Sequence, residues 1–465
     1  MLSHLTFPDP LRHNEYRSPF QRGADERPLR LFIDSHHLTH PLAASLLDEF
    51  ATHPLLKVWP THRDNRECFV LTRTDNDVLH VRFDTVTGWE STGVPFVSQW
   101  EAFSQNPPLR DGVVLPFGPW QEPSFRLQQY LLAQVAANIR ADIFVTDDPF
   151  LLEYDRVAVH RINVLSSSDA IALLASFLRS RGDFNCRISG SFTSMLGRGG
   201  FYWGLTRALL PSSWHWFSAG STADGPVADL TQIAQTALTR TEQALKARDN
   251  VHWLVLQPHN NETADDVLFY FDAFLLMLLG AFDAIAALAG TIIPPPSRAS
   301  ASWNNAGWLH ALRKDRDFCH VVLCLAPGST SGDSFRLLTL LRNTIHGPAL
   351  DTIAVQHGLS SRNRENFLAL PHAELPTLRH LIKQVGGYEA WGYDELPGYH
   401  ALVRPGAAVE HLTTAALGAI NEIMQRFPVE RLPGLPPDSV FMAGPPEERS
   451  WDTETRDRIM LLGGF

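Results

Sequence analysis

Two short apolar runs, each followed by aspartate, constrain the fold of this chain more than any other feature. Leu29–Ile33 precedes Asp34, and Ile143–Val145 precedes Thr146, Asp147 and Asp148. The second run follows a long amphipathic stretch, and this order is typical of a parallel sheet covered by helices. Because the carboxyl ends of parallel strands meet at one edge of a sheet, the pattern predicts that these acids lie together there.

The flanking segments extend this α/β pattern. A further strand is predicted within residues 157–165, and Ser166–Asp169 has the composition of an N-cap for a helix over 170–179. Two more strands are predicted at 68–71 and 78–83, around a turn. His36 and His40 have the spacing of metal ligands on a helix, but no third ligand accompanies them in sequence, so we interpret them as loop histidines.

Residues 28–182 resemble a PIN domain. The resemblance rests on the Asp-ended first strand, the late strand closing in Thr-x-Asp (Thr146, Asp148), and a capped helix reading Ser-Ser-Ser-Asp-Ala-Ile-Ala-Leu-Leu. It implies a metal-dependent nuclease fold in which acids hold Mg²⁺ or Mn²⁺ over a nucleic-acid phosphate. Asp34 and Asp148 match the family's acids, with Asp147 as a neighbour.

One position departs from the PIN pattern. The family usually places an acid near the start of the helix that precedes the Thr-x-Asp strand. Here that helix begins Phe-Arg-Leu-Gln-Gln-Tyr-Leu-Leu over 125–132, and the nearest carboxylate is Glu122. Fewer acids predict weaker metal binding.

The C-terminal half is predicted to be mainly helical with a small β element. Its most apolar stretch, 267–293, is interrupted by Asp272 and Asp283, which leave uncharged runs of about ten residues, whereas roughly 18 are needed to cross a membrane. A buried core helix and no membrane contact are therefore expected. Other elements are predicted as helices at 231–247, 335–346 and 409–427 and strands at 351–356 and 367–370.

A second constellation lies on the predicted helix 335–346. Arg342 and His346 are four residues apart and would share one helix face. An arginine holds a phosphate bidentately, and a histidine transfers protons near neutral pH. By spacing alone, the simpler interpretation is a histidine that complements the helix dipole beside a surface arginine.

The sequence Leu-Arg-Asn-Thr-Ile-His-Gly resembles the Arg-polar-x-x-His helix of HEPN domains, which are helical bundles found in RNases and in non-catalytic partners. The resemblance implies that Arg342 stabilises phosphate charge, that His346 serves in acid/base catalysis with Asn343 as polar neighbour, and that the chain forms a homodimer. The Arg-to-His spacing is shorter than in the nuclease members. Asp272 and Asp283, eleven residues apart on one helix face, are predicted partners of Arg342.

The length of 465 residues predicts two or three domains. The expected order is an N-terminal arm (1–27), the PIN-like α/β domain (28–182), an aromatic-rich connector (183–262), a HEPN-like helical domain (263–427) and a proline-rich C-terminal arm (428–465). The net charge of −11 excludes a global basic field for nucleic acid. Four cysteines without Cys-x-x-Cys spacing and a polar N-terminus favour the cytoplasm.

These patterns predict an endoribonuclease-like protein of RNA-processing, toxin or defence type. Cleavage would occur at the helical Arg342/His346 site or at the metal-dependent acidic site. The helical site is preferred because it retains both residues that its chemistry needs. The alternative is a non-catalytic interaction or scaffold protein that retains both folds with degenerate sites.

Overall fold

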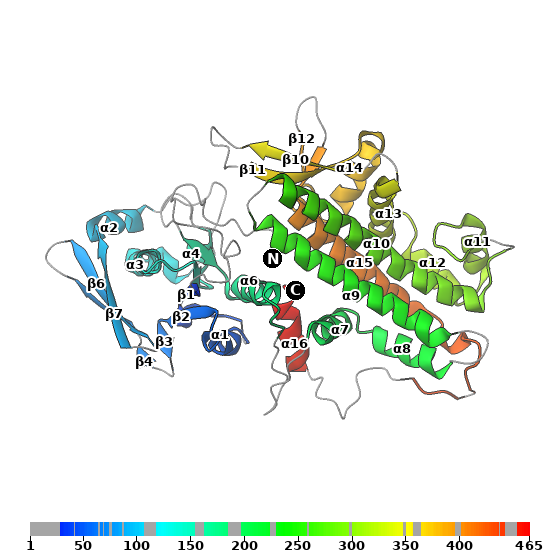
Figure 1. Ribbon diagram of the computed structural model, residues 1–465, viewed down its shortest axis with the longest axis horizontal. Helices are drawn as coiled ribbons and strands as arrows, with labels where there is room; N and C mark the ends of the chain where they lie inside the picture. Colours follow the sequence, from blue (N-terminus) through cyan, green and yellow to red (C-terminus); the bar gives the residue numbers. More distant parts are fainter. Residues whose placement is uncertain are drawn as a thin grey trace. The chain divides into compact units, whose positions relative to one another are not determined.

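The computed structural model describes most of the chain from residue 28 onwards (Figure 1). The described residues form two compact units: the first extends to Leu178 and includes Gly464–Phe465, and the second is Arg179–Gly463. Residues outside the description are 1–27, 41, 64–65, 68, 74–76, 86–87, 107–117, 154–161, 185–196, 224–228, 258–259, 297–299, 347–349, 357–363, 396–400, 437 and 442–452. The predicted N-terminal arm therefore lies outside the described residues.

A four-stranded parallel sheet forms the centre of the first unit. Its strand order is β2 (Leu56–Pro60), β1 (Leu29–Ile33), β8 (Ile143–Val145) and β9 (Asn163–Leu165). Strands β8 and β9 are buried throughout, as expected for strands covered on both faces. The predicted parallel sheet is confirmed, and β1 and β8 are neighbours that end at the same edge.

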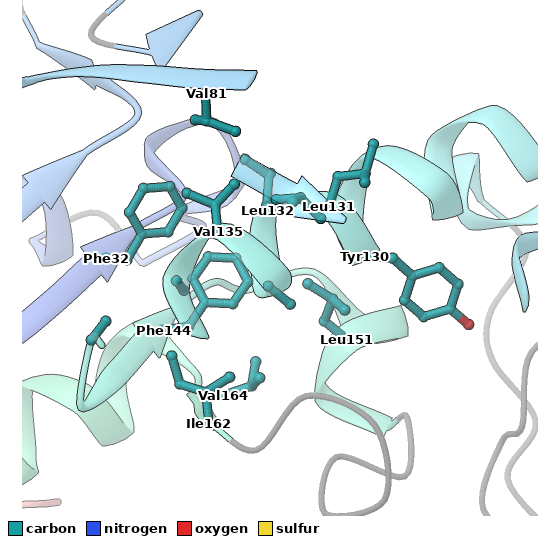
Figure 2. Packing of buried hydrophobic residues seen from close by; sticks show 14 of the residues in the cluster. Phe32, Val81, Tyr130, Leu131, Leu132, Val135, Phe144, Leu151, Ile162 and Val164 are labelled. Atoms are coloured by element: carbon teal, nitrogen blue, oxygen red, sulfur yellow. The ribbon is translucent and has the colours of Figure 1, made fainter. Parts of the chain in front are cut away.

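One face of this sheet is covered by α3 (Pro123–Asn138). Phe32 of β1 and Phe144 of β8 lie side by side with ring centroids 5.6 Å apart, and both belong to one buried cluster with Leu132 and Val135 of α3. Figure 2 shows these four side chains packed between strands and helix. Full burial of such a side chain contributes roughly 1.5–3 kcal/mol. This layer fixes α3 against β1 and β8.

The remaining elements of the first unit surround this sheet. The predicted hairpin is confirmed as β5 (Phe69–Arg73) and β6 (Val78–Thr85), and a third antiparallel strand, β7 (Gly88–Pro95), joins it. The predicted N-cap is also confirmed, because Oγ of Ser166 accepts from the N–H of Asp169 at the start of α6. The other elements are η2 (Ser35–His37), α1 (Ala43–Ala51), β3 (His62–Arg63), β4 (Arg66–Glu67), α2 (Val97–Gln105), η3 (Pro119–Gln121), α4 (Pro149–Glu153) and α6 (Ser167–Ser180).

The second unit is built around two long helices, α9 (Leu230–Val255) and α10 (Asn261–Ile292), which share the most extensive contact of any element pair. Asn260 caps α10 through a reciprocal bond with Thr263, so the helix begins at Asn261. Helix α10 is long and apolar enough to cross a membrane, but 61% of its most apolar window is buried within the protein. This burial is the pattern of a core helix.

The second unit also contains a small antiparallel sheet in the order β10 (Asp351–Gln356), β11 (Arg364–Ala369), β13 (Ala401–Val403) and β12 (Asp394–Glu395). The predicted β element and the predicted late helix, α15 (Pro405–Arg426), are both present. The other elements are α11 (Ala306–Lys314), α12 (Phe318–Cys324), α13 (Thr330–Asn343), η4 (Thr344–His346), η5 (His372–Glu374), α14 (Leu375–Gln384) and η6 (Val429–Arg431).

Two segments differ from their sequence-based expectation. Residues 183–262, expected as a connector with one helix at 231–247, contain that helix as the longer α9. They also carry two helices that were not expected, α7 (Arg198–Leu209) and α8 (Ser213–Thr222), which both pack on α9 and belong to the second unit. Residues 428–465, expected as an arm, contain α16 (Thr453–Leu462), which packs against α7. The segment before α16 is rich in proline, and the sequence pattern therefore did not indicate a packed helix there. In the structure Ile459, Leu461 and Leu462 of α16 are buried.

Buried arginines hold the end of α16. Arg248 of α9 is fully buried, and its Nη1 donates to the carbonyl oxygen of Gly463 at 2.9 Å. Nη1 of Arg179 donates to the carbonyl of Leu462 at 2.6 Å, and its Nε donates to Oδ2 of Asp249 at 2.9 Å. The negative end of the α16 dipole thus faces two cations. Asp249 supplies a balancing carboxylate.

Candidate active site

The two predicted acids of the sheet meet at the carboxyl edge of β1 and β8. Oγ1 of Thr146 donates to Oδ2 of Asp34 at 3.3 Å and accepts from the backbone N–H of Asp148 at 3.1 Å. Asp34 is 1% exposed and Asp148 is 2% exposed. The backbone ladder continues past the strands, since the N–H of Asp34 donates to the carbonyl of Val145 at 2.9 Å. The register of two parallel strands therefore positions both acids.

Asp148 has one bonded oxygen and one open oxygen. Its Oδ1 accepts from the N–H of Phe150 at 2.8 Å, which is a local turn that starts α4. Its Oδ2 is buried without a hydrogen-bond partner. Burial raises the pKa of Asp148, and the nearby charge of Asp34 adds to this rise, while the Phe150 bond and His37 oppose it. A buried carboxylate oxygen without a partner is costly, which makes it a candidate ligand atom.

His37 completes the edge. Its Nδ1 lies 2.7 Å from Oδ2 of Asp34, and this bond raises the pKa of His37 above its ordinary value. The ring meets Phe125 of α3 edge-on, with centroids 5.6 Å apart. Sequence reasoning weighed His36 and His40 and missed His37. The signal that points to it is its position three residues after Asp34, in the turn η2.

Asp147, the predicted neighbour in the metal site, is used for structure instead. Its Oδ1 accepts from the N–H of Ser167 at 2.6 Å, and its Oδ2 accepts from the N–H of Thr39 at 2.6 Å and from both hydroxyls. Burial alone would raise the pKa of Asp147, but these bonds hold it below its ordinary value. The side chain ties the loop after β1 to the start of α6.

The residues at this edge fit a hard divalent cation. Carboxylate oxygens are the ligands that Mg²⁺ and Mn²⁺ prefer, and such ions often use only one or two carboxylates plus water and substrate phosphate. Oδ2 of Asp148 is open for that purpose. Within the described part of the chain, no group of three His, Cys, Asp or Glu side chains is arranged to hold a metal. The site therefore offers two carboxylates rather than a complete protein cage.

The predicted pair Arg342 and His346 does not have the geometry expected of one helix. Helix α13 ends at Asn343, and Thr344–His346 form the 3₁₀ turn η4, so Arg342 and His346 do not lie on one continuous α-helical face. The side chain of His346 lies outside the described residues. Arg342 is half-buried with its Nε unpartnered, and its Nη1 lies 3.5 Å from Oδ1 of Asn343.

The predicted acid partners of Arg342 behave differently from each other. Asp283 is exposed, and partial loss of hydration raises its pKa while Arg342 and Arg240 lower it. Asp272 is half-buried with its Oδ1 unpartnered, and burial alone raises its pKa. Asp283 thus interacts electrostatically with Arg342, whereas no interaction of Asp272 with Arg342 is seen among the described residues.

No family model, curated protein or solved structure matches this chain. Function is therefore inferred from the chemistry of the site.

Proposed function

We propose that the first unit is a phosphodiesterase that depends on a divalent cation and cleaves RNA at the edge formed by Asp34 and Asp148. The observation that carries the proposal is the open, buried Oδ2 of Asp148 beside a second buried carboxylate. Mg²⁺ or Mn²⁺ held there would supply Lewis-acid stabilisation of phosphate charge and a nucleophilic water. The choice of RNA as substrate follows from the PIN resemblance of residues 28–182.

The protein's own groups have distinct tasks in this proposal. Asp34 and Asp148 provide the anionic oxygens. Oγ1 of Thr146 donates to the carboxylate of Asp34 and accepts from the backbone N–H of Asp148, so it orders one carboxylate and the backbone that carries the other. His37 orients the Asp34 carboxylate through its Nδ1, and its partly exposed ring is accessible to a substrate phosphate. Phe125 packs against that ring from α3 and limits its movement.

The second candidate is metal-free cleavage at Arg342 and His346 in the second unit. It is favoured by the unpartnered Nε of Arg342, which leaves a donor for an anion. The sheet edge is the stronger candidate because both of its acids are buried and the charge of Asp34 acts on Asp148. The HEPN-type homodimer and the cytoplasmic location remain predictions, and a scaffold protein with degenerate sites remains the non-catalytic alternative.

The test is cleavage of labelled RNA by the purified chain with Mn²⁺ or with EDTA. We expect cleavage that requires Mn²⁺ and falls by about 100-fold in Asp148→Asn and Asp34→Asn. Glu122→Gln is the matched control, since it removes an exposed carboxylate at the start of α3 and should retain activity within about twofold.

Two outcomes overturn the proposal. Cleavage that survives EDTA and is lost in His346→Ala would assign the chemistry to the second unit. Absence of cleavage in both conditions, together with absence of Mn²⁺ binding, would favour the scaffold alternative.

A further inference from the structure

Gln129 of α3 is the most anomalous polar residue in the first unit. It is fully buried, and neither Nε2 nor Oε1 of its amide has a hydrogen-bond partner. A buried polar group left without a partner costs roughly 1–3 kcal/mol, and nearly all such groups in native proteins are satisfied. An amide in this state requires an explanation.

The position of Gln129 on α3 is inferred from helix spacing. It lies four residues after Phe125, so the two side chains share the α3 face that meets His37. Leu132, further along this face, belongs to the cluster that covers Phe32 and Phe144 (Figure 2). From this spacing we infer that Gln129 lies between the end of the apolar core and the His37 ring.

The sheet presents its polar residues to this same layer. Side chains two residues apart on a strand point to one face, and the backbone pairing of β1 and β8 continues through Asp34. Asp34 therefore follows Phe32, and Thr146 follows Phe144, on the face that α3 covers. The unpartnered Oδ2 of Asp148 lies at the same edge.

We infer that Gln129 is the third protein oxygen of the cation site, a neutral amide donor above the two carboxylates. This inference rests on the proposed function of the sheet edge. It explains why Oε1 of the amide is left unbonded, and it supplies an oxygen on the helix where the expected carboxylate is absent. Because the amide oxygen is neutral, the protein ligands carry only the two negative charges of Asp34 and Asp148. The protein alone therefore binds the cation weakly. Substrate phosphate then completes the site, as is usual for Mg²⁺ in phosphoryl-transfer sites.

The experiment measures Mn²⁺ affinity of the full chain by electron paramagnetic resonance, without RNA. Gln129→Glu should bind Mn²⁺ on the order of tenfold more tightly than the wild type, because a third carboxylate is added. The same variant should be less stable in EDTA, because a further buried charge is left unpaired. Gln128→Glu is the matched control: this side chain is exposed on the same helix, and both properties should remain at wild-type values.

Gln129→Leu keeps the inference testable if Gln129→Glu fails to fold. Leucine removes the unpartnered amide, so stability in EDTA should rise while Mn²⁺ affinity falls. A leucine variant with wild-type Mn²⁺ affinity would overturn the inference. If the wild type itself binds no Mn²⁺, the proposed function fails as well; if Asp148→Asn loses Mn²⁺ binding while the Gln129 variants keep it unchanged, only the inference fails.

Discussion

Replacing Asp148 with asparagine should stabilise the protein while abolishing its proposed activity. Asparagine keeps an oxygen that accepts from the N–H of Phe150 and replaces the open Oδ2 with a neutral group. It also removes the repulsion from Asp34 that contributes to the raised pKa. The amide nitrogen of asparagine is still a buried polar group, so the gain comes from removing the buried negative charge; we expect a gain on the order of 1 kcal/mol in EDTA near pH 7.

The stability difference between the asparagine variant and the wild type should increase with pH. The folded protein binds the Asp148 proton more tightly than the unfolded chain does, because its pKa is raised. Wild-type stability therefore falls as pH rises from the ordinary aspartate value, about 3.9, through the raised folded value. The asparagine variant lacks this loss. Its advantage should be present at neutral pH and should shrink on acidification.

Guanidinium denaturation in EDTA measures the change, and hydrogen exchange of the β1 and β8 amides assigns it to the first unit. Added Mn²⁺ should reverse the order, since saturation at 100 times Kd stabilises a binding-competent protein by about 2.7 kcal/mol. An asparagine variant that is less stable than the wild type in EDTA would refute the reasoning, because Oδ2 would then have a favourable partner.

Two further substitutions test the energetics of buried and partly exposed pairs by denaturation. Asp249→Ala should cost roughly 3–5 kcal/mol, because it leaves Arg179 buried without its carboxylate. Arg426→Ala, which breaks the partly exposed pair with Glu422, should cost less than about 1 kcal/mol; similar costs would contradict this account. His37→Asn should destabilise the protein more at pH 5.5 than at pH 9. Because the pKa of His37 is raised in the folded state, its bond to Asp34 stabilises the protein fully below about pH 6.5, and this stabilisation is lost as pH rises through the folded-state pKa. A cost that does not depend on pH would argue against the ion pair.

The fold class was predictable because its signals are local. The buried strands β1 and β8 are short apolar runs that contain no competing turn residues. Helix α10 has a long apolar sequence and a polar start, which settle its type. Helices α7 and α8 were missed because their aromatic and glycine-rich sequences carry little helical periodicity, and their burial depends on partners far along the chain.

The site was predictable only in part. Strand ends brought Asp34 and Asp148 to one edge, as parallel topology requires. His37 depended on the tight turn after β1, which no sequence pattern specified. The burial of Gln129 depended on the rotation of α3 about its axis, and an uncharged residue gave no reason to single it out. Arg342 and His346 were placed on one helix because the conversion to a 3₁₀ turn after Asn343 leaves no clear mark in the sequence.

Asp147 and Asp148 show why adjacent identical residues take opposite roles. Strand β8 pairs with β9, and α6 begins directly after β9. The N–H of Ser167, at the N-terminus of α6, therefore lies beside Asp147 and donates to it. The N–H of Thr39 reaches the same carboxylate from the loop after β1, so Asp147 is bonded from both sides. Asp148 follows one residue later, within the turn that starts α4, and bonds only through Oδ1. The strand register therefore makes Asp147 structural and leaves Asp148 with an unpartnered oxygen. An exchange of these two roles would require β8 to shift by one residue. Such a shift would also turn Phe144 out of the core.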